Sequence, residues 1–151
     1  MSGKWHVAAH NDPPAHSLPE NRGFDRSTVV RTHIDSYWKV LAGCDIYRDG
    51  EIFIKGDNEK TNLKNPYRPD QDFYTTDFFT DVAIEYMEDA LAVKKTPFFL
   101  YLAYNAPHFP LEAPDEITAE YEVKFEDAEW LAPWGSGWDN MRQRKLVRQK
   151  E

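Results

Sequence analysis

The chain has 151 residues, the size of one domain, and hydrophobic residues make up 41% of it, which is enough for a core. Its 26 acidic and 18 basic residues give a net charge of -8, which argues against a nucleic-acid partner because such a partner requires clustered positive charge. The single cysteine, Cys44, excludes an internal disulfide, and no apolar run approaches the ~20 residues of a membrane span.

The N-terminal residues carry no capping signal, and we expect a loop from residue 11 to residue 22. The prolines in that stretch block both a helix and a central strand. His6 and His10 would share one face of a helix, and together with His16 they suggest a metal cluster. The prolines oppose such a helix and no closed set of four ligands is present, so loop histidines are the favoured interpretation.

Residues 23–43 are ambiguous, whereas residues 45–54 have a clear hairpin pattern. Ile46–Arg48 and Glu51–Ile54 flank Asp49-Gly50, and this dipeptide supplies the positive φ angles of a type I′ turn. Residues 56–72 are polar and contain Pro66 and Pro69, so we expect a loop there.

The clearest helix is expected at Thr75–Lys95. Apolar residues recur there at three- and four-residue spacing, which predicts one buried stripe. Asp77 suits the positive end of the helix dipole, and Lys94 and Lys95 suit the negative end. The stripe consists of Phe79, Val82, Ala83, Tyr86, Met87, Ala90 and Leu91.

A continuous apolar run, Phe98–Tyr104, follows this helix and predicts a central strand buried on both faces. We expect its parallel neighbour to lie before Gly3, outside the chain. His108 stands between Pro107 and Pro110, in a loop at the carboxyl end of the strand, and ligands bind at that edge of open α/β sheets. A histidine that merely satisfies a loop hydrogen bond is the alternative interpretation.

Two further helices are expected in the C-terminal part. One starts near Pro114 and runs to Glu122, and the other, rich in Arg and Lys, covers Asp139–Glu151. Neither Gly nor Pro terminates the second helix. We therefore expect both ends of the chain to lie inside a larger domain.

Five stretches of the chain resemble the sulfatase family in their sequence and in their order along the chain, and arylsulfatases are the most similar type. The resemblance spans nearly the whole chain, and its most specific parts are the Gly-Lys-Trp-His stretch and the strand that leads into Asn-Ala-Pro-His-Phe-Pro. The stretches are Gly3–His6, Pro19–Asp25, Tyr47–Glu51, Pro97–Pro110 and Gly137–Arg142.

The resemblance implies an α/β fold: part of an alkaline-phosphatase-like mixed sheet with flanking helices, truncated at both ends. It also implies that a sulfated small molecule or glycan is hydrolysed through a formylglycine nucleophile beside a calcium ion, in a periplasmic or secreted protein. Lys4 matches the family lysine that stabilises formylglycine and sulfate oxygens. His6 matches the histidine bound to the formylglycine hydroxyl, and His108 matches the one near the bridging oxygen of the leaving group.

The chain also departs from the family pattern. The family nucleophile lies in Cys-x-Pro-x-Arg or a serine variant, whereas Cys44 is followed by Asp-Ile-Tyr, and Ser17-Leu18-Pro19 places Arg22 one residue too late. We therefore interpret residues 1–151 as an internal segment of one sulfatase catalytic domain, without nucleophile or metal ligands and inactive alone. A non-catalytic remnant or binding fragment, and a phosphodiesterase or phosphonate hydrolase of the same superfamily, are the alternatives.

Overall fold

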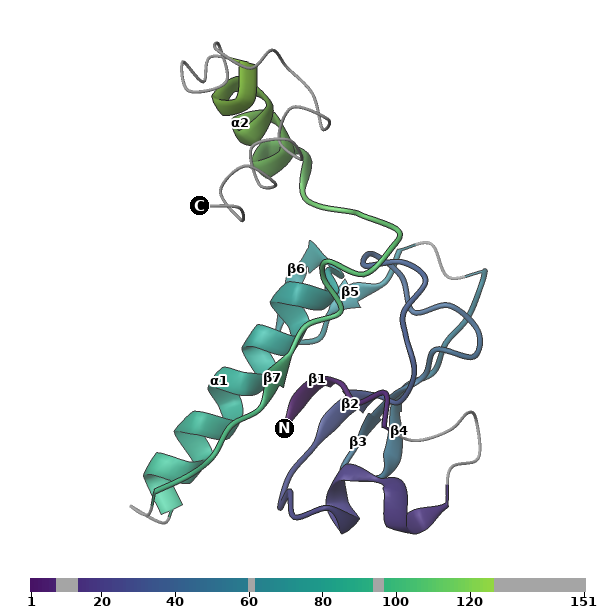
Figure 1. Cartoon of the computed structure of the whole chain (residues 1–151), viewed down its shortest axis with the longest axis vertical. Coiled ribbons are helices and arrows are strands. Elements are labelled where there is room, and N and C mark those ends of the chain that lie inside the picture. Colours follow the sequence, from purple (N-terminus) through teal and green to yellow (C-terminus); the bar gives the residue numbers. More distant parts are fainter. Residues whose placement is uncertain (8–13, 60–61, 94–96, 127–151) are drawn as a thin grey trace, which may run out of the picture. The chain divides into compact units, whose positions relative to one another are not determined.

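The computed structural model describes residues 1–7, 14–59, 62–93 and 97–126, which form two compact units, Met1–Glu112 and Ala113–Glu151 (Figure 1). Among the described residues, the first unit holds every strand and every helix except one. Its strands are β1 (Ser2–Lys4), β2 (Thr28–Val30), β3 (Ile46–Arg48), β4 (Glu51–Ile54), β5 (Lys64–Asn65), β6 (Arg68–Asp72) and β7 (Leu102–Ala103). Its helices are α1 (Thr75–Val93) and two single 3-10 turns, η1 (Ala15–Ser17) and η2 (Pro19–Asn21).

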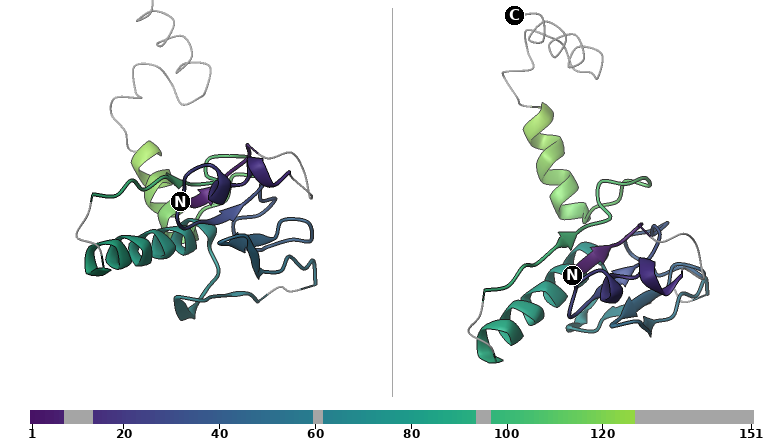
Figure 2. Two further views of the ribbon diagram at one scale, coloured as in Figure 1. Left: turned by 90° about the horizontal axis from the view of Figure 1, so that it is seen from below. Right: turned by 60° about the horizontal axis from the view of Figure 1, so that its bottom comes forward.

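Five of these strands form a mixed sheet in the order β4-β3-β2-β1-β7. β1 lies between β2 and β7 and is parallel to both, whereas β3 is antiparallel to β2 and to β4. β5 and β6 form a separate antiparallel pair. Both views in Figure 2 show α1 running alongside the five-stranded sheet. The expected α/β class with a mixed sheet is therefore confirmed.

The local predictions of the hairpin and the long helix are confirmed. β3 and β4 are joined at Asp49 and Gly50, whose φ angles are 50° and 93°, as a type I′ turn requires. α1 begins at Thr75 as expected and is described to Val93, while the two lysines that follow lie outside the described residues.

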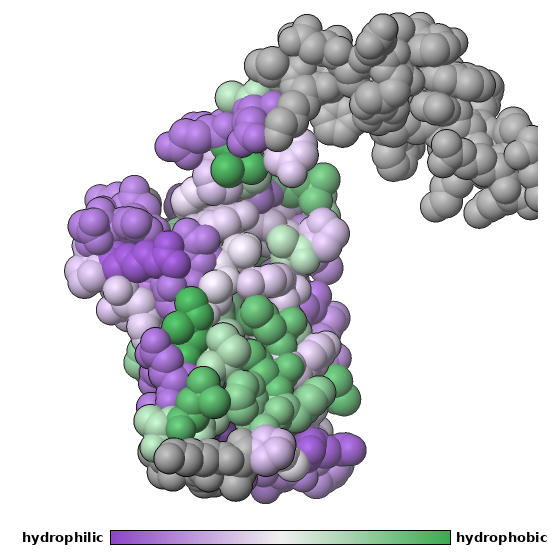
Figure 3. Space-filling model, turned by 90° about the vertical axis from the view of Figure 1, so that its left-hand side faces the viewer, coloured by the Kyte–Doolittle hydropathy of each residue, from purple (hydrophilic) through white to green (hydrophobic). Residues whose placement is uncertain are grey.

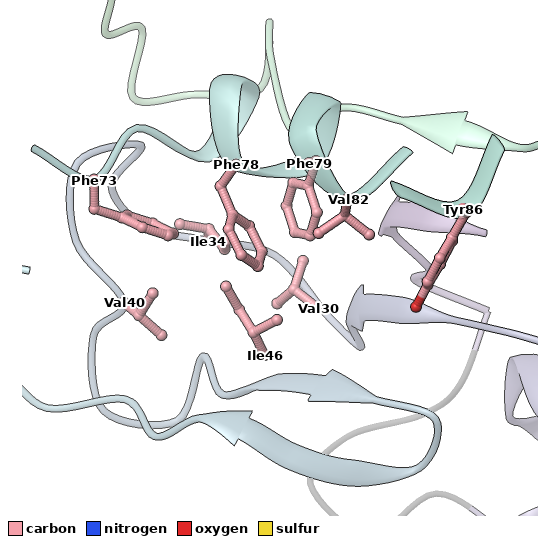
Figure 4. Packing of buried hydrophobic residues seen from close by; sticks show 9 residues of the cluster. All are labelled: Val30, Ile34, Val40, Ile46, Phe73, Phe78, Phe79, Val82 and Tyr86. Atoms are coloured by element: carbon pink, nitrogen blue, oxygen red, sulfur yellow. The ribbon is translucent and has the colours of Figure 1, made fainter. Parts of the chain in front are cut away.

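α1 packs against the sheet and forms the core (Figure 4). Of the predicted stripe, Phe79, Val82, Ala83 and Tyr86 are buried, but Leu91 is 62% exposed. Two buried hydrogen bonds fix the helix to neighbouring strands, because Ser2 Oγ donates to Phe79 O at 2.7 Å and Thr28 Oγ1 lies 2.7 Å from Tyr86 Oη. The remaining core residues are Val30, Ile34, Val40, Ile46, Phe73 and Phe78.

The prediction of a central strand at Phe98–Tyr104 is wrong for the described residues. Only Leu102–Ala103 forms a strand, and it lies at the edge of the sheet because β1 is its single neighbour. Phe98 is 47% exposed and Phe99 is 80% exposed. Apolar side chains gather on the face of the molecule shown in Figure 3.

The expected position of the parallel neighbour is also wrong, because β1 itself is that neighbour and lies within the chain. Its sequence, Ser-Gly-Lys, lacks the β-branched residues that identify strands. β2 is the element hidden in the ambiguous stretch, and all three of its residues are buried.

The polar stretch of residues 56–72 contains β5 and β6 rather than only a loop. Pro69 lies inside β6, which a two-stranded pair tolerates because each strand has a free edge.

The second unit contains α2 (Asp115–Glu126), which confirms the shorter helix that the sequence predicted after Pro114. The Thr118 N–H donates to Pro114 O at 3.0 Å at its start. The expected helix at Asp139–Glu151 lies outside the described residues. Within the described ranges, every helix is too short or too polar to cross a membrane.

Candidate active site

The carboxyl ends of β7, β1 and β2 meet at one edge of the sheet, because these neighbouring strands are parallel. Lys4 is the last residue of β1, and His6 follows two residues later. The pairing of β1 with β2 continues beyond the strands, since Trp5 N donates to Val30 O at 2.9 Å and His6 N donates to Arg31 O at 3.0 Å. The backbone therefore fixes both residues at this edge.

Gly3 explains why β1 and β7 approach so closely. Its φ angle is +117°, and a Cβ atom there would lie 1.9 Å from the carbonyl oxygen of Ala103. Only glycine fits such a contact between backbones. Gly3 therefore brings the end of β1, with Lys4, against the start of the loop that carries His108.

His6 has an unusual backbone and an altered acidity. Its φ angle of 47° lies in the left-handed region, which costs a non-glycine residue about 1–3 kcal/mol and is typical of functional sites. Desolvation lowers the pKa of the His6 imidazole below its ordinary value, and the nearby charges of Lys4, His33 and His108 lower it further. The ring is consequently neutral at neutral pH and can accept a proton.

His108 is exposed, and its backbone is fixed on both sides. Its N–H donates to Asn105 O at 2.8 Å, and its carbonyl oxygen accepts from the hydroxyl of Tyr37, a fully buried side chain. The ring atom Nδ1 lies 2.6 Å from Phe109 O. A carbonyl can only accept, so Nδ1 carries a proton and Nε2 is left for a ligand.

The amide of Asn105 lies at the same strand end and is also buried. Neither of its polar side-chain atoms has a hydrogen-bond partner among the described residues. A buried amide without a partner costs about 1–3 kcal/mol, so this one is available to a ligand.

His33 belongs to the same cluster, although sequence reasoning missed it. Its ring stacks on that of His108, with centroids 5.8 Å apart and an interplanar angle of 29°. Its Nε2 lies 3.0 Å from Asp35 Oδ1. The Thr-Val-Val run of β2 was the available signal, because a strand there would have placed the following loop at the carboxyl edge.

The structure thus places the side chains of Lys4, His33 and His108 near that of His6, and the ring of His33 on that of His108. An ammonium group and imidazole rings, which can donate hydrogen bonds, form an edge suited to an oxyanion. Among the described residues, no hydrogen bond, salt bridge or ring contact joins His16, in η1, to this cluster, and His10 lies outside those residues.

The described residues do not fit a metal ion or the family nucleophile. Within the ranges that the structure describes, no three His, Cys, Asp or Glu residues are placed to hold a metal ion. Cys44 is buried, with Sγ 3.9 Å from Asp35 Oδ2, and burial raises the pKa of its thiol. A protonated thiol is a poor nucleophile.

Several known proteins are similar to this chain in sequence. An uncharacterised sulfatase of Schizosaccharomyces pombe is 26% identical over 100% of this chain and 24% of its own length. The arylsulfatase of Klebsiella aerogenes is 28% identical over 83% of the chain and 25% of its own length. Arylsulfatase J of Mus musculus is 29% identical over 80% of the chain and 18% of its own length.

Among solved structures, Ps i-CgsB in complex with k-i-k-neocarrahexaose matches with a TM-score of 0.58 and 27% identity, over 80% of this chain and 26% of that one. The chain therefore spans about a quarter of the length of the first relatives and structures that it matches. The profile of the sulfatase family matches residues 1–145, and the chain belongs to the sulfatase family.

Proposed function

We propose that the whole protein hydrolyses a sulfate ester and that this chain supplies the residues that bind the sulfate and assist departure of the leaving group. The observation that carries the proposal is the convergence of Lys4, His6 and His108 at the carboxyl ends of adjacent parallel strands. Such edges hold the ligands of open α/β sheets.

The chemistry of the reaction suits these groups. Cleavage of the S–O bond increases negative charge on the leaving oxygen, and donors aimed there stabilise the transition state more than the ground state. The Lys4 ammonium is a point charge for a sulfate oxygen. His108, when it carries protons on both ring nitrogens, would donate the Nε2 proton to the leaving oxygen, while the Nδ1 proton stays in its hydrogen bond to Phe109 O.

His6 has the opposite role in this proposal. Its lowered pKa keeps the imidazole neutral, so the ring can accept a proton during release of sulfate. Protonation of His6 at acidic pH removes this capacity, so hydrolysis should decline as the pH falls through the pKa of His6, which lies below the ordinary histidine value.

Family membership suggests a formylglycine nucleophile and calcium, which in sulfatases would supply the attacking oxygen and a cation beside the sulfate. The described residues fit neither group: Cys44 is buried and no cluster of metal ligands exists among them. In this proposal Lys4, His6 and His108 contact the sulfate and the leaving group directly.

A sulfated small molecule or glycan is the proposed substrate. The relatives include proteins named arylsulfatase, and the matched structure was solved with a bound neocarrahexaose.

The test is hydrolysis of an aryl sulfate by the whole protein and by Lys4→Met and His108→Ala. Both substitutions should lower kcat/KM at least a hundredfold, the upper range for one acid or base being about 10⁴-fold. His16→Ala, which removes an exposed histidine outside the cluster, should leave hydrolysis unchanged. Faster turnover of a phosphodiester or phosphonate than of a sulfate would favour the alternative hydrolases, and binding of sulfate without turnover would favour the non-catalytic alternative.

A further inference from the structure

His33 and Asp35 form a pair that the proposed chemistry does not use. Both lie in the loop after β2, and His33 Nε2 is 3.0 Å from Asp35 Oδ1. The side chains are 46% and 57% exposed, and a polar contact so exposed contributes little to stability. The contact between His33 and Asp35 therefore has a role other than stability.

Asp35 is held from the side of the core as well. The Cys44 thiol lies 3.9 Å from Asp35 Oδ2, within reach of a weak hydrogen bond to sulfur. Cys44 is 5% exposed, and burial keeps this thiol protonated and so able to donate. A continuous chain of contacts thus leads from the buried Cys44 through Asp35 to the ring of His33.

The chain of contacts ends on His108. The rings of His33 and His108 stack with centroids 5.8 Å apart, although their loops follow strands that β1 separates in the sheet. Tyr37 and Asn105 fix the backbone of His108, whereas the Phe109 contact and this stacking are the contacts among the described residues that restrain rotation about its side-chain bonds. His33 is therefore the one side chain among the described residues that packs flat on the ring of His108.

We propose that His33 is a positioning residue, which, anchored by Asp35, holds the His108 ring with Nε2 directed at the leaving oxygen of the substrate. This inference rests on the proposed function of His108. Misplacing a catalytic group by about 1 Å costs about 10²-fold in rate, so a flat support for the ring has a measurable effect.

The kinetic test compares variants of the whole protein on an aryl sulfate. His33→Ala should lower kcat at least tenfold and change KM less than twofold, because the ring of His108 loses its support. His33→Phe keeps a ring but loses the anchor, so its kcat should be intermediate. Asp35→Ala should resemble His33→Phe, whereas Asp35→Asn keeps an acceptor oxygen and should retain most activity. His16→Ala is the control.

A second measurement is independent of turnover. In protein labelled with ¹³C at histidine Cε1, relaxation should show an ordered His108 ring in the wild type and a less ordered ring in His33→Ala, with no change in His16→Ala. Melting curves identify any variant that fails to fold, and His33→Phe and Asp35→Ala then replace His33→Ala.

The outcomes separate the inference from the proposed function. A wild-type protein without sulfate ester hydrolysis refutes the proposed function, and the relaxation data then decide whether His33 orders His108. An unchanged kcat in His33→Ala, when His108→Ala has lost activity, overturns the positioning role. A rise in KM alone also overturns it, because it identifies His33 as a binding residue, and so does an equally ordered His108 ring in His33→Ala.

Discussion

Replacing Gly3 with alanine should separate β1 from β7. The new Cβ would lie 1.9 Å from Ala103 O and 2.5 Å from the carbonyl carbon, and both are backbone atoms that cannot rotate away. The φ angle of +117° adds a strain of about 1–3 kcal/mol for any residue with a side chain.

The clash can be relieved only if the strands move apart. Such movement endangers the bond from Ser2 N to Tyr101 O, 3.0 Å long, and each such bond contributes about 0.5–1.5 kcal/mol. With the strain added, we expect the substitution to lower the free energy of unfolding by about 1.5–4.5 kcal/mol, a large part of a typical ~5–15 kcal/mol.

Gly23→Ala is the matched control, because Gly23 has a φ angle of +94° but nothing within 4 Å of its added Cβ. It therefore experiences the backbone strain without the clash. Urea unfolding followed by circular dichroism measures both variants. Equal destabilisation by the two substitutions would refute the close approach of β1 and β7.

Three further predictions follow from charge, exposure and the absence of a nucleophile among the described residues. Lys4→Met should raise the pKa of His6, measured by NMR titration, because a cation that lowers it is removed; an unchanged pKa would place Lys4 away from His6. Phe99→Lys should reduce light scattering of the purified chain on heating, since Phe99 is 80% exposed beside an edge strand, and unaltered scattering would exclude this face as the site of association. The 151-residue chain alone should not hydrolyse an aryl sulfate, because Cys44 is buried; turnover abolished by His108→Ala would prove this wrong.

The elements that the sequence revealed are those with local signals. α1 was identified by its apolar stripe and the β3–β4 hairpin by Asp49-Gly50, because in both cases the stabilising contacts are close in sequence. β1 and β2 were missed because each has three residues and is defined by pairing with distant segments. Local propensity cannot report such pairing.

The run Phe98–Tyr104 illustrates the converse error. Its composition is that of a buried strand, yet the described part of the chain pairs only Leu102–Ala103 and leaves Phe99 exposed. An apolar composition shows that a segment favours burial. Whether the segment is buried depends on neighbouring strands and helices, which its own sequence does not specify.

The candidate site also contains residues that the sequence indicated and one residue that it did not. Lys4, His6 and His108 were proposed as site residues because of the resemblance to a family, and the structure places them at one edge of the sheet. His33 has no such motif, and only the register of β2 beside β1 and the ring contact with His108 bring it into the cluster.

Titration with inorganic sulfate tests the central claim, that this edge binds the sulfate group, most directly. In protein labelled with ¹³C at histidine Cε1, the resonances of His6 and His108 should move along one common saturating isotherm, while that of His16 stays constant. Lys4→Met should lower the affinity for sulfate that this isotherm measures. Unmoved resonances of His6 and His108 at high sulfate, or an equal response of His16, would contradict the claim.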